Sequence, residues 1–276
     1  MADAPDDARD DAPDRFRRGS LAVNDPIDLT GRTALVTGST QGIGLTLAGG
    51  LARAGATVVL NGRTAERLVA PLDALRAAGH TAHGVPFDVT KPDEVEPAIA
   101  RIEADIAPID ILVNNAGIQR RAPFQDFAAE DWQAIMRTNL DSMFTVGQAV
   151  ARRMVVRQRG RIINICSVQS ELGRPGIAPY TASKGAVKML TKAMCAEWGK
   201  HNIQANGISP GYFGTELNQS LMADEKFSAW VCARTPQARW GKVEELQGAA
   251  IFLASDASSF VNGNILFVDG GMTAVV

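Results

Sequence analysis

The sequence predicts an α/β fold in which a central parallel sheet of about seven strands is flanked by helices. Seven short runs rich in β-branched residues alternate with longer segments rich in Ala and Leu, and this alternation is typical of a parallel sheet covered on both faces. The 276 residues, 46% of them hydrophobic, suffice for one large domain. The sequence holds neither an internal repeat nor a second domain.

The order of the elements follows from these runs. We expect strands at residues 33–37, 57–60, 81–87, 109–114, 161–166, 203–209 and 264–268. Helices are expected in between, because segments such as 45–54, 65–78 and 243–254 carry Ala and Leu at helical spacing. Strands that alternate with helices in this way predict a single doubly wound domain of the Rossmann type.

Two segments depart from the alternation. Residues 1–26 mix Asp, Ala, Pro and Arg without periodicity, so they are predicted to be a disordered tail that precedes a folded domain at 27–276. Residues 211–241 interrupt the rhythm with Trp230, Trp240 and scattered polar residues. That composition favours a mobile flap that closes on a substrate.

Composition and charge narrow the class of partner. The formal net charge is −2 and the pI is near 6.0, which gives no electrostatic reason to bind nucleic acid or an anionic membrane. A small-molecule partner is expected instead. Cys166, Cys195 and Cys232 are odd in number and widely spaced, which argues against a disulfide framework or structural zinc and favours a reduced, cytoplasmic protein. His80 and His83 have no further ligands nearby in sequence, so no metal site is expected.

The first predicted β-to-α turn, residues 37–44, is rich in glycine. Glycines permit a tight turn and the close approach of a pyrophosphate to a helix N-terminus. The spacing is wider than GxGxxG, so an ordinary loop remains the alternative. The expected cofactor contacts in this turn are Gly38, Ser39, Thr40, Gln41, Gly42, Ile43 and Gly44.

The end of the second predicted strand indicates which dinucleotide binds. An acidic residue at this point would hold the ribose hydroxyls of NAD, but the sequence has Asn61 and Arg63 there. A guanidinium suits the 2′-phosphate of NADP, so NADP(H) is preferred, and NAD(H) stays possible if Arg63 is only a solvated residue. Asp88, followed by Val89, is expected near the adenine. The alternative for Asp88 is an N-terminal cap of the next helix.

Three side chains predict proton transfer. Tyr180 and Lys184 are four residues apart in a helical segment and so share one face, where the ammonium would favour the phenolate form of the tyrosine. Ser167 follows a predicted buried strand, whose end would present its hydroxyl to a substrate. A hydrolase nucleophile is the alternative for Ser167, but GxSxG is missing around it. The three together predict an oxidoreductase.

These motifs resemble those of the short-chain dehydrogenase/reductase family. The resemblance runs from Leu29 to the C-terminus and rests on TGSTQGIG at 37–44, NNAG at 114–117, Ser167, YTASK at 180–184 and PG at 210–211. It implies that Asn139 joins Ser167, Tyr180 and Lys184 in a catalytic tetrad. It also implies further cofactor contacts at Asn115, Ala116, Gly117, Pro210, Gly211, Tyr212, Phe213 and Thr215.

The resemblance also implies a mechanism. Ser167 hydrogen-bonds the reacting oxygen and Tyr180 exchanges its proton, while hydride passes between the substrate carbon and the nicotinamide. Lys184 lowers the pKa of Tyr180 and holds the nicotinamide ribose, and Asn139 positions a water that links Lys184 to solvent. Family members of this length are commonly homotetramers.

A closer resemblance points to one branch of the family. NNAGIQRR at 114–121, INICSVQSELGR at 163–174, RTPQARWG at 234–241 and FVNGNILFVDGG at 260–271 are similar to members that interconvert D-gluconate and 5-keto-D-gluconate. A sugar acid needs a cation for its carboxylate, and Arg120 is the first choice, with Gln169 and Arg174 beside it. Other keto sugar acids, a 3-oxoacyl thioester, or NADP binding without turnover are the alternatives.

Overall fold

The computed structural model describes residues 26–276, so the predicted N-terminal tail lies outside the described residues except for Pro26. Within the described chain the seven predicted runs form one sheet, in the order β3-β2-β1-β4-β5-β6-β7 with every pair parallel. The strands are β1 Thr33–Val36, β2 Thr57–Gly62, β3 Ala82–Pro86, β4 Ile111–Asn114, β5 Gly160–Ile165, β6 Ile203–Pro210 and β7 Ile265–Val268. The predicted fold class is confirmed.

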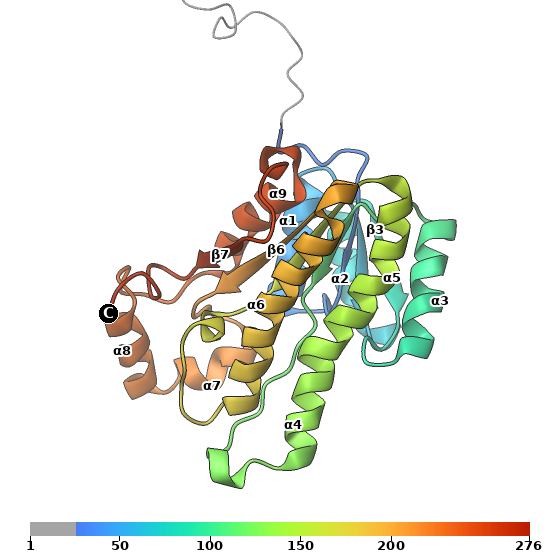
Figure 1. The fold of residues 1–276 in the computed structure, drawn as a ribbon. Helices are drawn as coiled ribbons and strands as arrows, with labels where there is room; N and C mark the ends of the chain where they lie inside the picture. Colours follow the sequence, from blue (N-terminus) through green and yellow to red (C-terminus); the bar gives the residue numbers. More distant parts are fainter. Residues whose placement is uncertain (1–25) are drawn as a thin grey trace, which may run out of the picture.

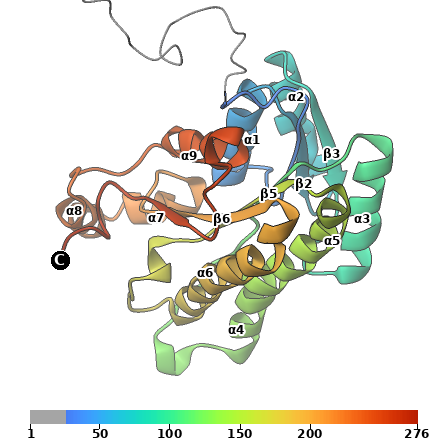
Figure 2. The ribbon, with the colours of Figure 1, turned by 45° about the horizontal axis from the view of Figure 1, so that its top comes forward.

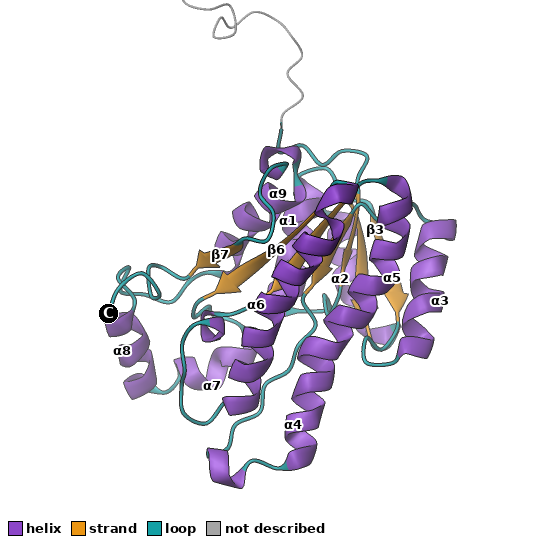
Figure 3. Cartoon of the chain, viewed as in Figure 1, coloured by secondary structure: helices purple, strands orange, loops and turns teal. Residues whose placement is uncertain are grey.

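Helices cover both faces of this sheet (Figure 1, Figure 3). Figure 2 shows α1, α2 and α9 on one side, with α3, α5 and α6 on the other. The helices are α1 Gly42–Arg53, α2 Glu66–Ala77, α3 Pro92–Asp105, α4 Ala129–Met136, α5 Ser142–Arg157, α6 Ala178–Trp198, α7 Gln219–Met222, α8 Glu225–Arg234 and α9 Gln247–Ala254.

Alternation along the strands divides the core into two apolar layers. In β1, Ala34 and Val36 face the layer under α1 and α9, whereas Leu35 faces the layer under α3 and α5. In β4, Leu112 likewise points to the second layer. All are fully buried, which explains why these strands read as continuous apolar runs in the sequence.

The strand order reverses between β1 and β4, and this reversal places the site. Chain segments leave the carboxyl ends of these two neighbouring strands in opposite directions, which opens a crevice at that edge of the sheet. The segments after β1, β2, β4, β5 and β6 all begin at the same edge.

The segment 211–241 is not one long loop. It contains α7, α8 and a single 3₁₀ turn at Glu216–Asn218. Its two ends are tied together, because Gly214 donates to the Gly241 carbonyl at 3.0 Å and Gly241 donates to the Tyr212 carbonyl at 2.9 Å. The C-terminus lies beside α8 (Figure 1), where Arg234 donates to the Val275 carbonyl. The closing motion predicted for this segment stays a prediction.

No helix in residues 26–276 has both the length and the apolar character to cross a membrane.

Candidate active site

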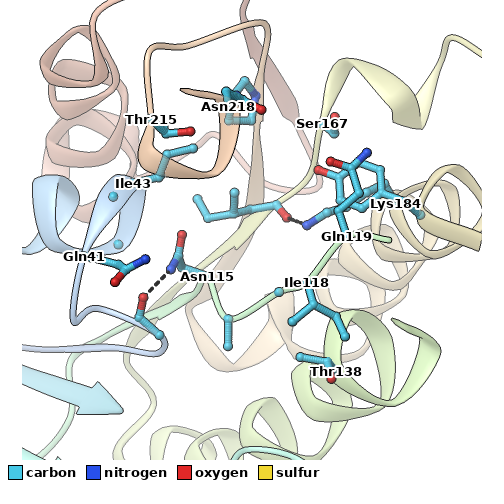
Figure 4. A pocket seen from close by; sticks show the side chains of 18 of the residues that line it. Gln41, Ile43, Asn115, Ile118, Gln119, Thr138, Ser167, Lys184, Thr215 and Asn218 are labelled. Atoms are coloured by element: carbon cyan, nitrogen blue, oxygen red, sulfur yellow. Dashed lines mark hydrogen bonds between the residues drawn. The ribbon is translucent and has the colours of Figure 1, made fainter. Parts of the chain in front are cut away.

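A cavity of about 780 Å³ opens at the carboxyl edge of the sheet. Its volume is in the range of small-molecule and cofactor sites. Figure 4 shows residues from several separate segments around it. The predicted site residues that line it are Gly38, Thr40, Gln41, Gly42, Ile43, Gly44, Asn61, Arg63, Asp88, Val89, Asn115, Ala116, Gly117, Arg120, Ser167, Gln169, Arg174, Tyr180, Lys184, Pro210, Gly211, Tyr212, Phe213 and Thr215.

The glycine turn leaves room for an anion at the start of α1. Gly42 has φ +57° with nothing within 4 Å of a Cβ built on it, and no side chain caps the helix that begins there. The first N–H groups of the helix are therefore free for a ligand. A Cβ on Gly38, by contrast, would lie 2.9 Å from the Ala116 Cα, so the turn packs tightly against the loop after β4. These features fit a dinucleotide pyrophosphate.

Asn115 joins that loop to the turn (Figure 4). Its Nδ2 donates to the Thr37 and Gly38 carbonyls, both at 3.0 Å, and its backbone N–H donates to the Thr37 hydroxyl. Gly44 allows this contact, because a Cβ there would lie 2.4 Å from Asn115 Nδ2.

Ser39, predicted to contact the cofactor, instead lies behind the turn and outside the cavity. Its buried hydroxyl donates to the Val36 carbonyl at 2.7 Å and accepts from the Asn61 N–H at 3.0 Å. The side chain of Asn61 is also engaged with backbone, accepting from Gly38 and donating to Phe87. Both residues therefore shape the turn with their side chains rather than offering them to a ligand.

Two arginines lie where β2 ends. Arg63 and Arg67 both line the cavity, and within residues 26–276 neither guanidinium has a hydrogen bond or ion pair. The sequence reasoning missed Arg67, which lies in the first turn of α2, although a second arginine so soon after Arg63 was a usable signal. Asp88 accepts from the Thr90 N–H and hydroxyl at 2.9 and 2.7 Å, while α3 begins after Lys91. Asp88 therefore does not cap α3, which was the alternative from sequence.

The proton-transfer side chains come together on the opposite wall. Ser167 follows β5, and its hydroxyl accepts from the Gln169 N–H at 3.2 Å. Tyr180 and Lys184 project from the same face of α6, with the Lys184 Nζ 5.6 Å from the centre of the tyrosine ring. Lys184 Nζ also donates to the Ile165 carbonyl at 2.6 Å, a bond drawn in Figure 4.

Burial dominates the electrostatics of this group. It raises the pKa of Tyr180, an effect that a hydrogen bond with Ser167 opposes. It lowers the pKa of Lys184 to about 8, an effect opposed by Cys166. Lys184 Nζ lies near the Tyr180 ring and also bonds to strand β5. The sequence prediction that its ammonium favours the phenolate stays a prediction.

Asn139 lies outside the cavity and is fully buried. It belongs to a π-helical turn between α4 and α5, at Arg137–Asp141, and such turns are frequent at functional sites. Its side chain accepts from the Ile118 N–H at 2.8 Å and donates to the Ile118 carbonyl and the Ser183 hydroxyl. Asn139 thus connects the loop after β4 to α6, next to Lys184.

The predicted substrate residues differ in their surroundings. Arg120 lines the cavity, and its half-exposed guanidinium is ion-paired with Asp131, so its role as the carboxylate ligand stays a prediction. Arg174 Nε and Gln169 Oε1 are buried and have no hydrogen-bond partner in the described part of the chain. Both therefore retain bonding capacity toward the cavity.

Other residues line the cavity although they are distant from the predicted site residues or were not singled out in the sequence. Most of them carry no motif and are uncharged, although Ile118 and Gln119 lie within the NNAGIQRR stretch at 114–121. They include Phe87, Thr90, Ile118, Gln119, Ala134, Thr138, Ile177, Asn218 and Leu221.

The family profile described as "short chain dehydrogenase" matches residues 32–226. The chain belongs to the short-chain dehydrogenase family. This dehydrogenase is 61% identical over 249 residues to gluconate 5-dehydrogenase of Gluconobacter oxydans, covering 90% of this chain and 97% of the relative. It is 55% identical to 5-keto-D-gluconate 5-reductase of Escherichia coli K12 over 254 residues, covering 92% of this chain and 100% of the relative.

Solved structures agree with these similarities. A gluconate 5-dehydrogenase from Burkholderia cenocepacia, in complex with NADP and tartrate, aligns with the dehydrogenase at a TM-score of 0.90 and 60% identity. The alignment covers 91% of this chain and 99% of that one.

Proposed function

We propose that this dehydrogenase interconverts D-gluconate and 5-keto-D-gluconate by NADP-dependent hydride transfer, with Tyr180 as the acid/base. The observation that carries the proposal is one cavity that holds Tyr180, Ser167 and Lys184 opposite the N-terminus of α1 and two arginines, for which residues 26–276 offer no capping side chain and no ion pair, respectively. The 61% identity to a gluconate 5-dehydrogenase supports the substrate. The Burkholderia relative was crystallised with NADP and with tartrate, which is itself a hydroxy acid.

The cofactor would be held along the edge of the sheet. The N-terminus of α1 at Gly42 would bind the pyrophosphate, and Arg63 with Arg67 would bind the 2′-phosphate of the adenosine half. Asp88 and Val89 would border the adenine. Asn115, Ala116, Gly117, Pro210, Gly211, Phe213 and Thr215 would complete the contacts.

The chemistry divides between the cofactor and the chain. When bound, NADP(H) accepts or donates the hydride. Ser167 hydrogen-bonds the oxygen on C5, and Tyr180 gives that oxygen a proton during reduction or removes one during oxidation. Lys184, with a pKa near 8, holds the ribose and exchanges protons close to neutral pH. Asn139 keeps the loop after β4 against α6, and its π-helical turn would position the water that returns protons to Lys184.

We also propose that the enzyme acts in the cytoplasm as a homotetramer. Exposed apolar side chains on the long helices support association, with Phe144 and Val156 on α5 at 54% and 83% exposure and Met189 on α6 at 59%. The three cysteines are free, as a reducing compartment would keep them.

The direct test is spectrophotometric oxidation of NADPH and NADH with 5-keto-D-gluconate, beside other keto sugar acids and a 3-oxoacyl thioester. We expect NADPH-preferring reduction of 5-keto-D-gluconate that Tyr180→Phe abolishes while NADPH still binds. Faster turnover of another ketone would replace the substrate and leave the mechanism standing. Binding of NADPH without turnover of any ketone would favour a binding protein and reject the enzyme.

A further inference from the structure

One arginine beside the catalytic tyrosine has no acidic partner. Arg174 lines the cavity and forms no ion pair in the described chain, whereas Arg120 is paired with Asp131. Arg121 also forms no ion pair there, and its pKa is lowered by partial burial and by the positive charge of Arg174, but it does not line the cavity. An uncompensated guanidinium at a cavity suits an anionic ligand.

Arg174 is the better placed of the two. It lines the cavity together with Tyr180, and its charge acts to lower the pKa of that tyrosine. Its Nε is buried without a partner, so the edge of the guanidinium keeps an unused donor. Gln169, on the same wall and 7% exposed, has a free acceptor for a substrate hydroxyl.

Four aromatic rings from the 211–241 segment cluster at this end of the cavity, where Tyr212 lines the wall and the other three pack against it. We call them the aromatic cover; they are Tyr212, Phe227, Trp230 and Trp240. Tyr212 is central, since its ring centroid lies 5.7 Å from Phe227, 5.9 Å from Trp230 and 5.7 Å from Trp240. Such edge-on packing stabilises a cluster beyond the area that it buries.

The guanidinium and the cover are in direct contact. Arg174 Cζ lies 5.1 Å from the centre of the Phe227 ring, in a cation–π arrangement that uses the face of the guanidinium and leaves its edge available. Tyr212 also lies within the electrostatic range of Arg174 and Arg121. The position of Arg174 is therefore coupled to the position of the cover through Phe227.

We propose that Arg174 binds the carboxylate of the substrate, and that this binding holds the aromatic cover closed. The inference rests on the proposed function, since it takes the substrate to be a sugar acid. A carboxylate bound at the edge of the guanidinium fixes Arg174 in the position in which its face lies over the Phe227 ring. The substrate's charge thereby couples recognition at one end to closure over the reacting carbon.

A neutral substrate separates this role from a structural one. L-Sorbose has the skeleton of 5-keto-D-gluconate with a hydroxymethyl group in place of the carboxylate. For Arg174→Gln we expect KM for 5-keto-D-gluconate to rise roughly 10- to 100-fold, the range of a charge-assisted hydrogen bond. The kcat/KM for L-sorbose should stay within about threefold of the wild type, and Arg174→Lys should restore part of the affinity. Arg101→Gln, on the exposed face of α3, controls for loss of charge.

Tryptophan emission reports closure. Adding D-gluconate to the NADP complex should change the emission of the wild type. The change should persist in Trp132→Phe but disappear when Trp230 and Trp240 are both replaced by Phe. Arg174→Gln should lack the change even at saturating D-gluconate.

Each contrary result has a definite meaning. If Arg174→Gln lost kcat/KM equally for 5-keto-D-gluconate and L-sorbose, the carboxylate role would be overturned. An increase in KM confined to Arg120→Gln would overturn it as well. An intact emission change in Arg174→Gln would overturn the coupling to closure. If the wild type reduces a different charged ketone with the same dependence on Arg174, the proposed substrate fails and the inference stands.

Discussion

The burial of Lys184 should make the stability of the folded protein depend on pH. Lys184 is 4% exposed, and burial lowers its pKa from 10.5 to about 8. Between these values the unfolded chain binds a proton that the folded chain has released, so the free energy of unfolding rises with pH across the interval. Burial of this charged lysine thus lowers the free energy of unfolding by about 3 kcal/mol at pH 7, and by only about 1 kcal/mol at pH 10.

We predict that the stability of Lys184→Met relative to the wild type is greater at pH 7 than at pH 10. The change in the free energy of unfolding caused by the substitution should be about 2 kcal/mol more positive at pH 7 than at pH 10. The lost bond to the Ile165 carbonyl lowers stability at both pH values, so the difference between them isolates the ammonium charge. Urea titrations followed by tryptophan fluorescence provide the measurement. Lys192→Met, on the exposed side of the same helix, controls for removing a lysine. The same shift at both pH values in Lys184→Met would refute the reasoning.

Three further predictions concern the cofactor and the cysteines. Replacing both Arg63 and Arg67 by Gln should weaken NADPH binding roughly 10- to 100-fold and leave NADH binding nearly unchanged, because only NADPH carries the 2′-phosphate. Titration calorimetry would measure both affinities, and an equal loss of affinity for the two cofactors would rule out this role. Gly44→Ala should lower both the melting temperature and the NADPH affinity, since its Cβ would lie 2.4 Å from Asn115 Nδ2 and 2.5 Å from the Gly38 carbonyl oxygen. Gly248→Ala is the control: a Cβ there would have nothing within 4 Å, so it should lower neither quantity. Burial raises the pKa of Cys166 to about 11, so iodoacetamide at pH 8 should label it only after unfolding in urea; mass spectrometry that finds it labelled in the native protein would contradict this.

The strands and the cofactor turn could be predicted from sequence because they depend on local pattern. A fully buried parallel strand is a continuous apolar run, and the glycines of the first turn are needed for its backbone conformation. The same locality placed Tyr180 and Lys184 on one face of a helix. Each of these predictions requires only neighbours within a few residues.

The rest of the site depends on contacts across the fold. The sequence places Arg120 near the pocket as the first choice for the carboxylate, but only the position of α4 brings Asp131 to it. Ser39 stands in the glycine motif yet faces the core, because Asn61 from the next strand bonds to it from behind. The desolvation that sets the pKa of Lys184 comes from packing against β5 and could not be read from its spacing to Tyr180.

The bonds from Asn115 to Thr37 and Gly38 have a consequence for how the protein matures on the ribosome. The glycine turn is synthesised early, but the side chain that fixes its carbonyls belongs to a residue 78 positions later than Thr37. A nascent chain that ends before Asn115 therefore carries the phosphate-binding motif without the geometry that makes it a binding site. We therefore expect dinucleotide to stabilise the folding chain only after β4 has joined β1.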